Sequence, residues 1–224
     1  MFEWSISGRQ YAGQSVLGSL NLALERGETH CLVGASGCGK TTLLTTLAGL
    51  ESGGDLKWNG KTPEIGYLFQ QPRLLPWRTL KQNLMLIEPD EGRVLSMLEA
   101  VNLVDYTEYF PTRISLGMAR RAALARCLLL EPDLVLMDEP LVSLDAPTAK
   151  QMRQLIQNLI CKDPERCMIY VTHDLDEALE IGDKISVLGN SPSEIVYTAN
   201  ADDLSRESLE EILQKQFDQA ISSN

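Results

Sequence analysis

A glycine-rich segment at residues 34–41 constrains the fold of this chain more than any other feature of the sequence. The segment reads GASGCGKT and fits the pattern GxxxxGK[ST]. A strand-like run, His30–Val33, precedes it, and apolar residues at helical spacing follow it. This order is typical of a loop that wraps a phosphate group, because backbone N–H groups and the positive end of the helix point at the anion. The flanks disfavour the alternative of an ordinary glycine-rich turn.

Two side chains of this loop have specific roles in phosphate chemistry. We expect the Lys40 ammonium to reach the β and γ phosphates and the Thr41 hydroxyl to be a ligand of Mg²⁺. The other contacts come from the backbone, which glycines allow to approach the anion closely. The residues of this segment expected to bind nucleotide are Gly34, Ser36, Gly37, Cys38, Gly39, Lys40, Thr41 and Thr42.

The rest of the chain alternates strand-like and helical runs. Near-continuous apolar runs are typical of strands buried on both faces of a sheet. They occur at His30–Val33, Ile65–Phe69, Leu134–Met137, Met168–Thr172 and Ile185–Leu188. Strands that alternate with helices predict an α/β protein with a parallel sheet.

The patterns divide one domain into three parts. Residues 72–130 show helical spacing and no convincing strand, so we expect a helical subdomain inserted into an α/β core of about residues 1–71 and 131–190. Residues 191–224 form a short polar tail, which we expect to end in an amphipathic helix. The apolar face of that helix carries Leu209, Ile212, Leu213 and Phe217.

Composition excludes several classes of function. The chain has 31 acidic and 20 basic residues and a net charge of −11, which disfavours general nucleic-acid binding because phosphates favour a basic surface. No apolar run is long enough to span a bilayer, and the first ten residues, MFEWSISGRQ, do not resemble a signal peptide. The five cysteines form no CxxC pair, so we expect reduced thiols in a cytoplasmic protein, without disulfides or a zinc site.

Acidic residues follow one of the expected strands. Asp138 and Glu139 come directly after Leu134–Met137, at the carboxyl edge of the sheet, where an Asp that supports magnesium belongs. We expect Asp138 to hold Mg²⁺ through its water shell and Glu139 to act as general base toward the attacking water. The phosphate loop disfavours the alternative, which is two acids that only cap a strand.

The two histidines of the chain have different expected roles. His30 lies inside a strand, so we expect a packed core residue. His173 directly follows the strand Met168–Thr172, where its ring could contact the γ phosphate and orient the water. Taken alone, His173 would be assigned a structural role.

These motifs, in this order, resemble the nucleotide-binding subunit of ATP-binding-cassette (ABC) transporters from about residue 11 to residue 188. The resemblance implies that Tyr11 stacks on adenine, that His173 is the switch histidine, and that Asp145 lies in a loop crossing a dimer interface. It also implies that Gln70 meets Mg²⁺ and the attacking water and senses a membrane partner. Gln71 is a competing candidate, and Gln70 is preferred because it directly follows the end of a strand.

The resemblance also implies a fold and a reaction. The fold is an α/β P-loop NTPase (RecA-like) core with an inserted α-helical subdomain. Two ATPase subunits, identical or different, sandwich two molecules of ATP with Mg²⁺, and their closure moves a separate integral membrane subunit. Hydrolysis of ATP to ADP and phosphate releases the pair, and some systems add a substrate-binding protein. The implied location is cytoplasmic and peripheral, on the inner face of the cell membrane.

The segment Ile114–Met118 departs from the family signature, LSGGQ. Ser115 and Gly117 match the signature, and the resemblance implies that they cap the ATP bound to the opposite subunit through a helix N-terminus. Leu116 replaces a glycine and is expected to restrict the backbone where glycine was free. Three consequences stay open: the side chain points away, dimer closure is slower, or the chain pairs with a different subunit.

Two further segments resemble different branches of the family. Pro72–Trp77 resembles a loop of importers of the nitrate, sulfonate and taurine type, and Gly117–Arg126 is more similar to ATPases of phospholipid-trafficking systems. The two resemblances point in different directions, the first to an importer of small anions and the second to a lipid transport system, and neither segment is expected to contact the cargo. Leu74, Leu75 and Trp77 either meet a coupling helix of the membrane subunit or pack within the helical subdomain, and both contacts are compatible.

The sequence supports two competing functions less well. An ABC-type ATPase that transports nothing is disfavoured by the lack of a coiled-coil insertion, zinc cysteines, a second cassette or a basic surface signal. A small P-loop kinase leaves Gln70, the segment Ser115–Met118 and Asp145 unexplained. The sequence therefore favours an ATP-hydrolysing transporter subunit.

Overall fold

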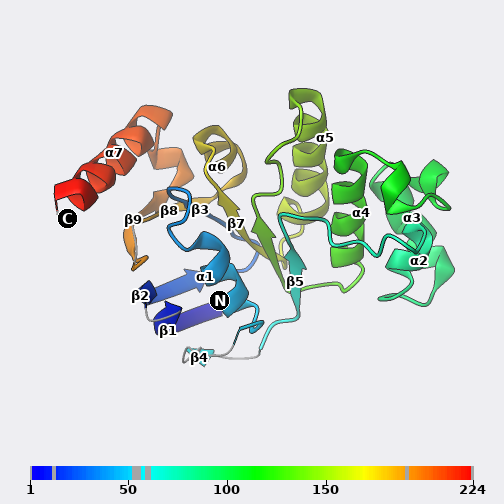
Figure 1. Ribbon diagram of the computed structural model, residues 1–224, viewed down its shortest axis with the longest axis horizontal. Helices are drawn as coiled ribbons and strands as arrows, with labels where there is room; N and C mark the ends of the chain where they lie inside the picture. Colours follow the sequence, from blue (N-terminus) through cyan, green and yellow to red (C-terminus); the bar gives the residue numbers. More distant parts are fainter. Residues whose placement is uncertain (1, 12–13, 52–56, 59–61, 190–191, 223–224) are drawn as a thin grey trace.

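The computed structural model describes residues 2–11, 14–51, 57–58, 62–189 and 192–222. Its centre is a six-stranded sheet in the order β5-β6-β7-β3-β8-β9 (Figure 1). Strands β5, β6, β7, β3 and β8 are parallel, and β9 runs antiparallel to β8. The bounds are β3 Thr29–Val33, β5 Ile65–Leu68, β6 Leu134–Asp138, β7 Cys167–Thr172, β8 Lys184–Leu188 and β9 Ile195–Asn200. The five parallel strands confirm the predicted ones, with bounds that differ by one residue.

The parallel strands are buried because helices and a second sheet cover both faces. Every residue of β3, β6 and β7 is buried. A small antiparallel sheet, in the order β2-β1-β4, covers one face together with helix α1. Its bounds are β1 Phe2–Tyr11, β2 Gln14–Leu24 and β4 Lys57–Trp58, and α1 spans Lys40–Leu47. This layer buries Trp4 and Ile6 of β1 in one core cluster with Leu43 and Leu44 of α1.

The small sheet and β9 were not predicted from the sequence. In β1 the buried Trp4 and Ile6 flank the exposed Ser5, so only alternate residues enter the core. In β9 Val196 and Tyr197 are exposed. Such strands lack the near-continuous apolar run that identified the parallel strands. The tail after residue 190 therefore contributes a sheet strand, which corrects the expectation of a polar segment with only a helix.

Helices of the core flank the other face of the main sheet (Figure 1). They are α5 Ala146–Ile156, continued by a π-helical turn at Gln157–Cys161, α6 Leu175–Ile181 and the C-terminal α7 Arg206–Ser222. In α7, Leu209 is buried, and Ile212 and Leu213 pack against the core, as the amphipathic pattern predicts. The side chain of Phe217 lies outside the described part.

Residues 72–130 contain helices and turns and no strand, as the periodicity predicts. They form α2 Leu80–Leu84, α3 Glu91–Ala100, two 3₁₀ turns at Val104–Tyr106 and Pro111–Arg113, and α4 Leu116–Leu128. Figure 1 shows α2, α3 and α4 beyond the β5 edge of the main sheet. The buried Leu80, Leu84, Val94 and Leu98 of α2 and α3 belong to the same core cluster as residues of α4.

None of the five cysteines is in a disulfide. Among the described residues, no helix combines the length and the apolar character that crossing a bilayer requires.

His30 is a packed core residue, as predicted. It is 3% exposed in β3, and its Nε2 lies 2.8 Å from the Ser186 hydroxyl oxygen of β8. Burial lowers the pKa of His30 from 6.5 to about 4, with Glu28 acting in the opposite direction and Lys184 in the same direction. Protonation of this imidazole therefore favours the unfolded chain.

We predict that the free energy of unfolding of the wild type falls more steeply than that of His30→Gln between pH 6.5 and pH 4. In this range the unfolded histidine binds a proton before the folded one does, so stability is lost as pH falls. The difference reaches about 3 kcal/mol near pH 4. Urea denaturation of both proteins at several pH values measures it, and equal slopes would contradict the assignment.

Candidate active site

The phosphate loop connects β3 to α1, as predicted, and its geometry depends on Gly39. This residue caps α1 with φ 97°, a left-handed conformation that glycine adopts without strain. A Cβ at this position would lie 2.6 Å from the Ser193 hydroxyl oxygen. Any larger residue would therefore push the loop away from the buried side chain of Ser193.

The two functional side chains of the loop point toward the end of the central strands. Lys40 is 5% exposed, and its Nζ donates to the carbonyl oxygens of Gly34 and Ala35, each at 2.9 Å. The same Nζ lies 3.9 Å from Oε1 of Glu139. The ammonium is thus held in the loop beside the carboxyl end of β6.

The hydroxyl of Thr41 donates to Oδ2 of Asp138 at 2.9 Å, which joins the loop to the end of β6. The pKa of Asp138 is raised, chiefly because burial disfavours the carboxylate. The hydrogen bond from Thr41 opposes that shift, and the charge of Glu139 adds to it. A cation at this carboxylate would offset the cost of its burial.

Gln70 and His173 converge on Glu139, the residue that follows Asp138. Glu139 follows the strand, and its side chain is 17% exposed. Its Oε2 accepts from Nε2 of Gln70 at 3.3 Å, and its Oε1 lies 3.4 Å from Nδ1 of His173. The backbone of Glu139 has φ 45°, which is strained for a residue with a side chain, and its N–H donates to the Val171 carbonyl at 3.0 Å. The carboxylate is thereby aimed between Gln70 and His173.

A cavity of about 340 Å³ lies over these groups. Its walls are Val16, Ser36, Gly37, Gly39, Lys40, Thr41, Thr42, Gln70, Asp138 and Glu139. Val16 was not predicted, because a lone valine in an unrecognised strand carries no chemical signal. Gly34 and Cys38 do not line the cavity. Cys38 is buried beneath the loop, and burial raises the pKa of its thiol.

Tyr11 is the last residue of β1, and its side chain lies outside the described part. Glu139 also lines a second cavity, of about 550 Å³. His173 and the loop after β6, including Ser143 and Leu144, line it as well. Glu139 therefore borders both cavities.

The signature residues do not line the cavity with Lys40. Ser115 caps α4 by accepting the N–H of Met118 at 3.2 Å. Leu116 is the first residue of α4, its φ is not positive, and its side chain is 43% exposed. Leucine therefore adopts the backbone conformation at this position without strain, and the expected consequences for dimer closure and for subunit pairing stay predictions.

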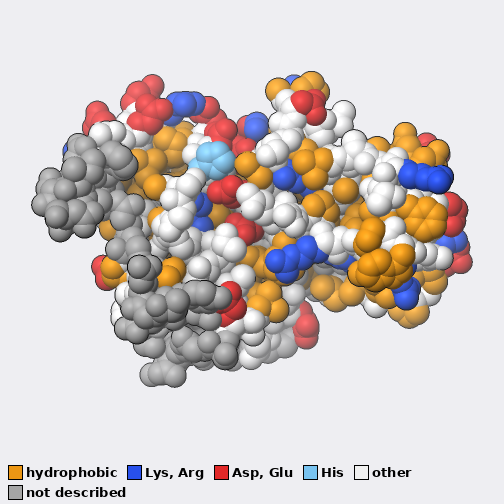
Figure 2. Space-filling view, in the orientation of Figure 1, with side chains coloured by type: hydrophobic (Ala, Val, Ile, Leu, Met, Phe, Trp, Pro, Cys, Tyr) orange, Lys and Arg blue, Asp and Glu red, His pale blue; other side chains and the backbone are white. Residues whose placement is uncertain are grey.

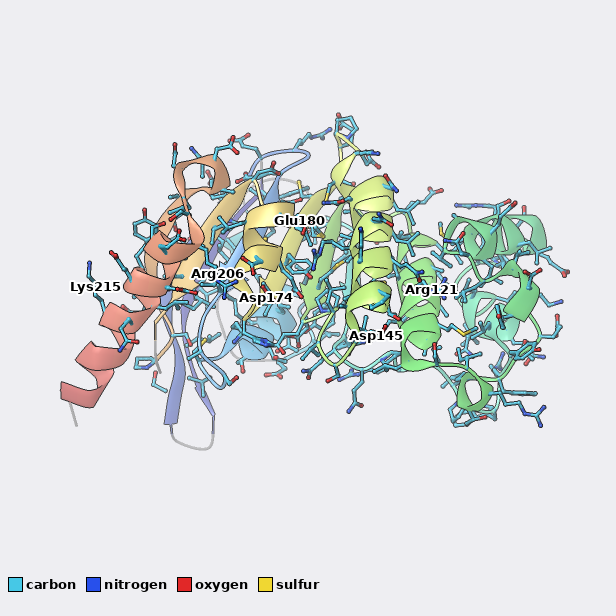
Figure 3. All side chains as sticks on the ribbon, turned by 90° about the horizontal axis from the view of Figure 1, so that it is seen from above. Arg121, Asp145, Asp174, Glu180, Arg206 and Lys215 are labelled. Carbon is cyan, nitrogen blue, oxygen red and sulfur yellow. The ribbon has the colours of Figure 1, made fainter. Side chains whose placement is uncertain are left out.

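Asp145 also has a role within its own chain. Its carboxylate caps α5 by accepting the N–H of Thr148 at 3.4 Å, and hydrogen bonding to Thr148 lowers the pKa of Asp145. Figure 3 shows Asp145 at the start of α5, next to α4. Gly117 of α4 packs on the first turn of α5, and a Cβ at Gly117 would lie 2.3 Å from Cγ2 of Thr148. Gly117 thus lets the two helix starts come together.

Comparison with known proteins identifies the family of this chain. A sequence model of the ABC transporter family matches residues 17–142. The aliphatic sulfonates import ATP-binding protein SsuB 2 of Burkholderia lata is 38% identical over 206 residues, which cover 87% of this chain and 75% of that protein. The chain belongs to the ABC transporter family. It is an ATPase, as ATP-binding proteins of this family hydrolyse ATP.

Other comparisons agree with this assignment to the ABC ATPases. SsuB of Bacillus licheniformis is 40% identical over 193 residues, covering 81% of this chain and 75% of that protein. A solved structure, the dimeric post-hydrolysis state of the ATP-binding cassette MJ0796 bound to ADP and Pi, superposes with a TM-score of 0.77. It covers 90% of this chain and 99% of that chain at 24% identity, and the likeness confirms the fold.

We predict that Gly117→Ala destabilises this ABC ATPase by about 1–3 kcal/mol, because the added methyl group overpacks the contact with Thr148. Removing the opposing methyl group in Gly117→Ala/Thr148→Ala is expected to restore most of the loss. Thermal unfolding of the single and double variants, with Thr148→Ala as the control, measures the coupling. Additive effects of the two substitutions would contradict direct packing.

Proposed function

We propose that this chain is the ATP-hydrolysing subunit of an importer and that it acts with a second ATPase subunit on a separate integral membrane subunit. The observation that carries the proposal is the convergence of Lys40, Thr41, Asp138, Glu139 and Gln70 on one cavity. The sulfonate import names of the relatives and the likeness of Pro72–Trp77 to a loop of such importers support aliphatic sulfonates as the cargo class.

The residues of the cavity fit ATP and Mg²⁺. Lys40 and the backbone N–H groups of the loop would hold the β and γ phosphates. Thr41, Asp138 and Gln70 offer hydroxyl, carboxylate and amide oxygens, the ligand type that Mg²⁺ prefers. The contact between Thr41 and Asp138 already brings two of these oxygens within 2.9 Å of each other. Bound Mg²⁺ would supply neutralisation of the phosphate charge.

The proposed chemistry of the protein itself centres on Glu139. Its carboxylate would accept a proton from the attacking water, while Gln70 and His173 fix the carboxylate from two sides. His173 is 54% exposed, so its ring can reach toward a phosphate as well as toward Glu139. The loss of the terminal phosphate would then open the site.

The second ATPase subunit completes the site in this proposal. Ser115 and Leu116 are exposed at the N-terminus of α4, and Asp145 is exposed at that of α5. A helix N-terminus favours anions, so the α4 end suits the γ phosphate of ATP on a facing subunit. Either a second copy or a different ATPase subunit fits this geometry.

The proposed membrane partner would dock on the helical end of the molecule. Exposed apolar side chains gather there (Figure 2). The N–H groups of Leu80 and Lys81 in α2 donate to the carbonyls of Tyr109 and Thr107, which brings two stretches of these side chains together. The docking patch consists of Trp77, Met85, Leu86, Ile87, Tyr106, Tyr109 and Phe110. An apolar patch with several aromatic residues is typical of a protein interface.

With this docking, the chain would be a peripheral subunit at the cytoplasmic face of the cell membrane. Trp77 is 69% exposed, which favours a contact with the membrane subunit over packing within the helical segment. Leu74, by contrast, packs against the core. A substrate-binding protein would deliver the cargo to the membrane subunit from the other side, as an importer requires.

We predict that Glu139→Gln binds ATP with a dissociation constant within about twofold of the wild type and loses at least about 100-fold in turnover. The amide keeps the shape of the carboxylate and cannot accept the proton of water. Titration calorimetry and steady-state ATPase measure the two effects, and size-exclusion chromatography with ATP is expected to show a dimer. Lys40→Ala is the contrasting variant, in which ATP affinity itself falls. A wild-type rate in Glu139→Gln would remove Glu139 from the reaction.

We also predict that Trp77→Ser/Tyr109→Ser keeps ATP affinity and loses the membrane subunit. Truncating two aromatic anchors of an interface costs at least about 2 kcal/mol, or roughly 30-fold in affinity. Affinity purification from native membranes, with mass spectrometry of the co-purifying multispan protein, measures the loss. Val196→Ser, which alters an exposed apolar residue on β9, is the control. Full recovery of the membrane subunit with the double variant would place the interface elsewhere.

A further inference from the structure

Three arginines of α4 donate hydrogen bonds to backbone carbonyls in three different segments. Arg120 donates to Pro140, Arg126 donates to Pro72 and Arg73, and Arg121 donates to Val101 and Asn102. Burial lowers the pKa of all three guanidinium groups. Such desolvated charges are costly unless they make hydrogen bonds, so each contact restrains its acceptor.

Arg120 holds the turn that carries Glu139. It is buried, and its Nη1 lies 2.8 Å from the carbonyl oxygen of Pro140, the residue after Glu139. Glu139 itself has φ 45°. A strained conformation persists only where neighbouring contacts enforce it, and Arg120 supplies such a contact from outside the strand.

Arg126 holds the turn that follows Gln70 in the same way. Its Nη1 lies 2.9 Å from the Arg73 carbonyl oxygen, and its Nη2 lies 3.1 Å from that of Pro72. Arg73 also has a left-handed backbone, with φ 47°. Its guanidinium stacks 3.6 Å from the ring centre of Phe69, the residue before Gln70. This second strained turn is therefore also clamped from α4.

We propose that Arg120 and Arg126 are positioning residues that make α4 set the placement of Glu139 and Gln70. Neither arginine lines the cavity with Lys40. Each acts through a carbonyl next to a strained residue. The N-terminus of the same helix carries Ser115 and Gly117, so movement of α4 on contact with a facing subunit changes the Glu139 and Gln70 turns of its own chain. The inference rests on the proposed roles of Glu139 and Gln70 in hydrolysis.

Arg121 provides a matched control on the same helix. Its Nη1 lies 3.0 Å from the Val101 carbonyl and 3.2 Å from that of Asn102, both within the helical segment. Figure 3 labels Arg121 on α4, on the side away from α6 and α7. Arg121 therefore shares its chemistry and its helix with Arg120 and Arg126, but its hydrogen bonds go to the helical segment rather than to the turns after Glu139 and Gln70.

The test compares Arg120→Met, Arg126→Met and Arg121→Met in steady-state ATPase assays of the purified full chain. Methionine keeps much of the side-chain length and removes the donors. We expect kcat to fall about tenfold in the first two variants, with KM for ATP within about twofold, because positioning affects the reaction more than binding. Arg121→Met is expected to keep both constants within about twofold, and thermal unfolding monitors stability in all three.

Two further variants test the same role of Arg120. Arg120→Gln replaces Arg120→Met if the latter fails to fold, and it is expected to show the same loss of kcat because the shorter side chain cannot span to Pro140. In the Glu139→Gln background, Arg120→Met is expected to cause no further loss, since both act on one group.

Wild-type kcat in Arg120→Met, or an equal loss in Arg121→Met, would overturn the inference. The Glu139→Gln variant separates this failure from that of the proposed function. An inactive Glu139→Gln beside a fully active Arg120→Met rejects only the positioning role. A fully active Glu139→Gln rejects the proposed role of Glu139 itself.

Discussion

The site depends on the parallel pairing of β5, β6, β7 and β3. The register places Val33 beside Thr172, Val171 beside Asp138, and Met137 beside Leu68. Since parallel strands end at the same edge of a sheet, the segments that follow these strands must meet there. The phosphate loop, the two acids, the glutamine and the histidine thereby form one site although they are far apart in the sequence.

Three of the five described non-glycine residues with positive φ lie at this edge of the sheet or in the loops beside it. Glu139, Ser143 and Arg73 all have positive φ without being glycine. Burial on both faces makes the strands rigid, so contacts with neighbouring elements can hold these loops in conformations that are unfavourable in isolation. The guanidinium groups of α4 are well suited to this, because Arg120 is buried, Arg126 is half-buried, and both donate to carbonyls of neighbouring segments.

The same helix also joins the two halves of the molecule. It packs against α2 and α3 on one side and against β5 and α5 on the other. Gly117 keeps its first turn close to the start of α5, where Asp145 is the cap. The exposed N-terminal ends of both helices therefore lie together on the surface.

The sequence predicted the parallel strands and most of the site. Long apolar runs identify strands buried on both faces, and Lys40, Thr41, Asp138 and Glu139 lie at fixed offsets from two of them. The half-buried strands β1, β2 and β9 were not predicted, because the burial of their residues depends on which side chains face the main sheet. Val16 was not predicted for the same reason, because it lines the cavity only where β2 packs beside the phosphate loop.

The sequence by itself determined the phosphate loop, the buried strands and the acids at a strand end, because local spacing and hydrophobicity suffice to specify them. The tertiary structure decided which residues touch. It joined Gln70 and His173 to Glu139, showed that Leu116 begins a helix with ordinary backbone, and placed Gly117 on Thr148. These are long-range contacts and backbone angles that arise only when separate elements pack together, so no local pattern in the chain encodes them.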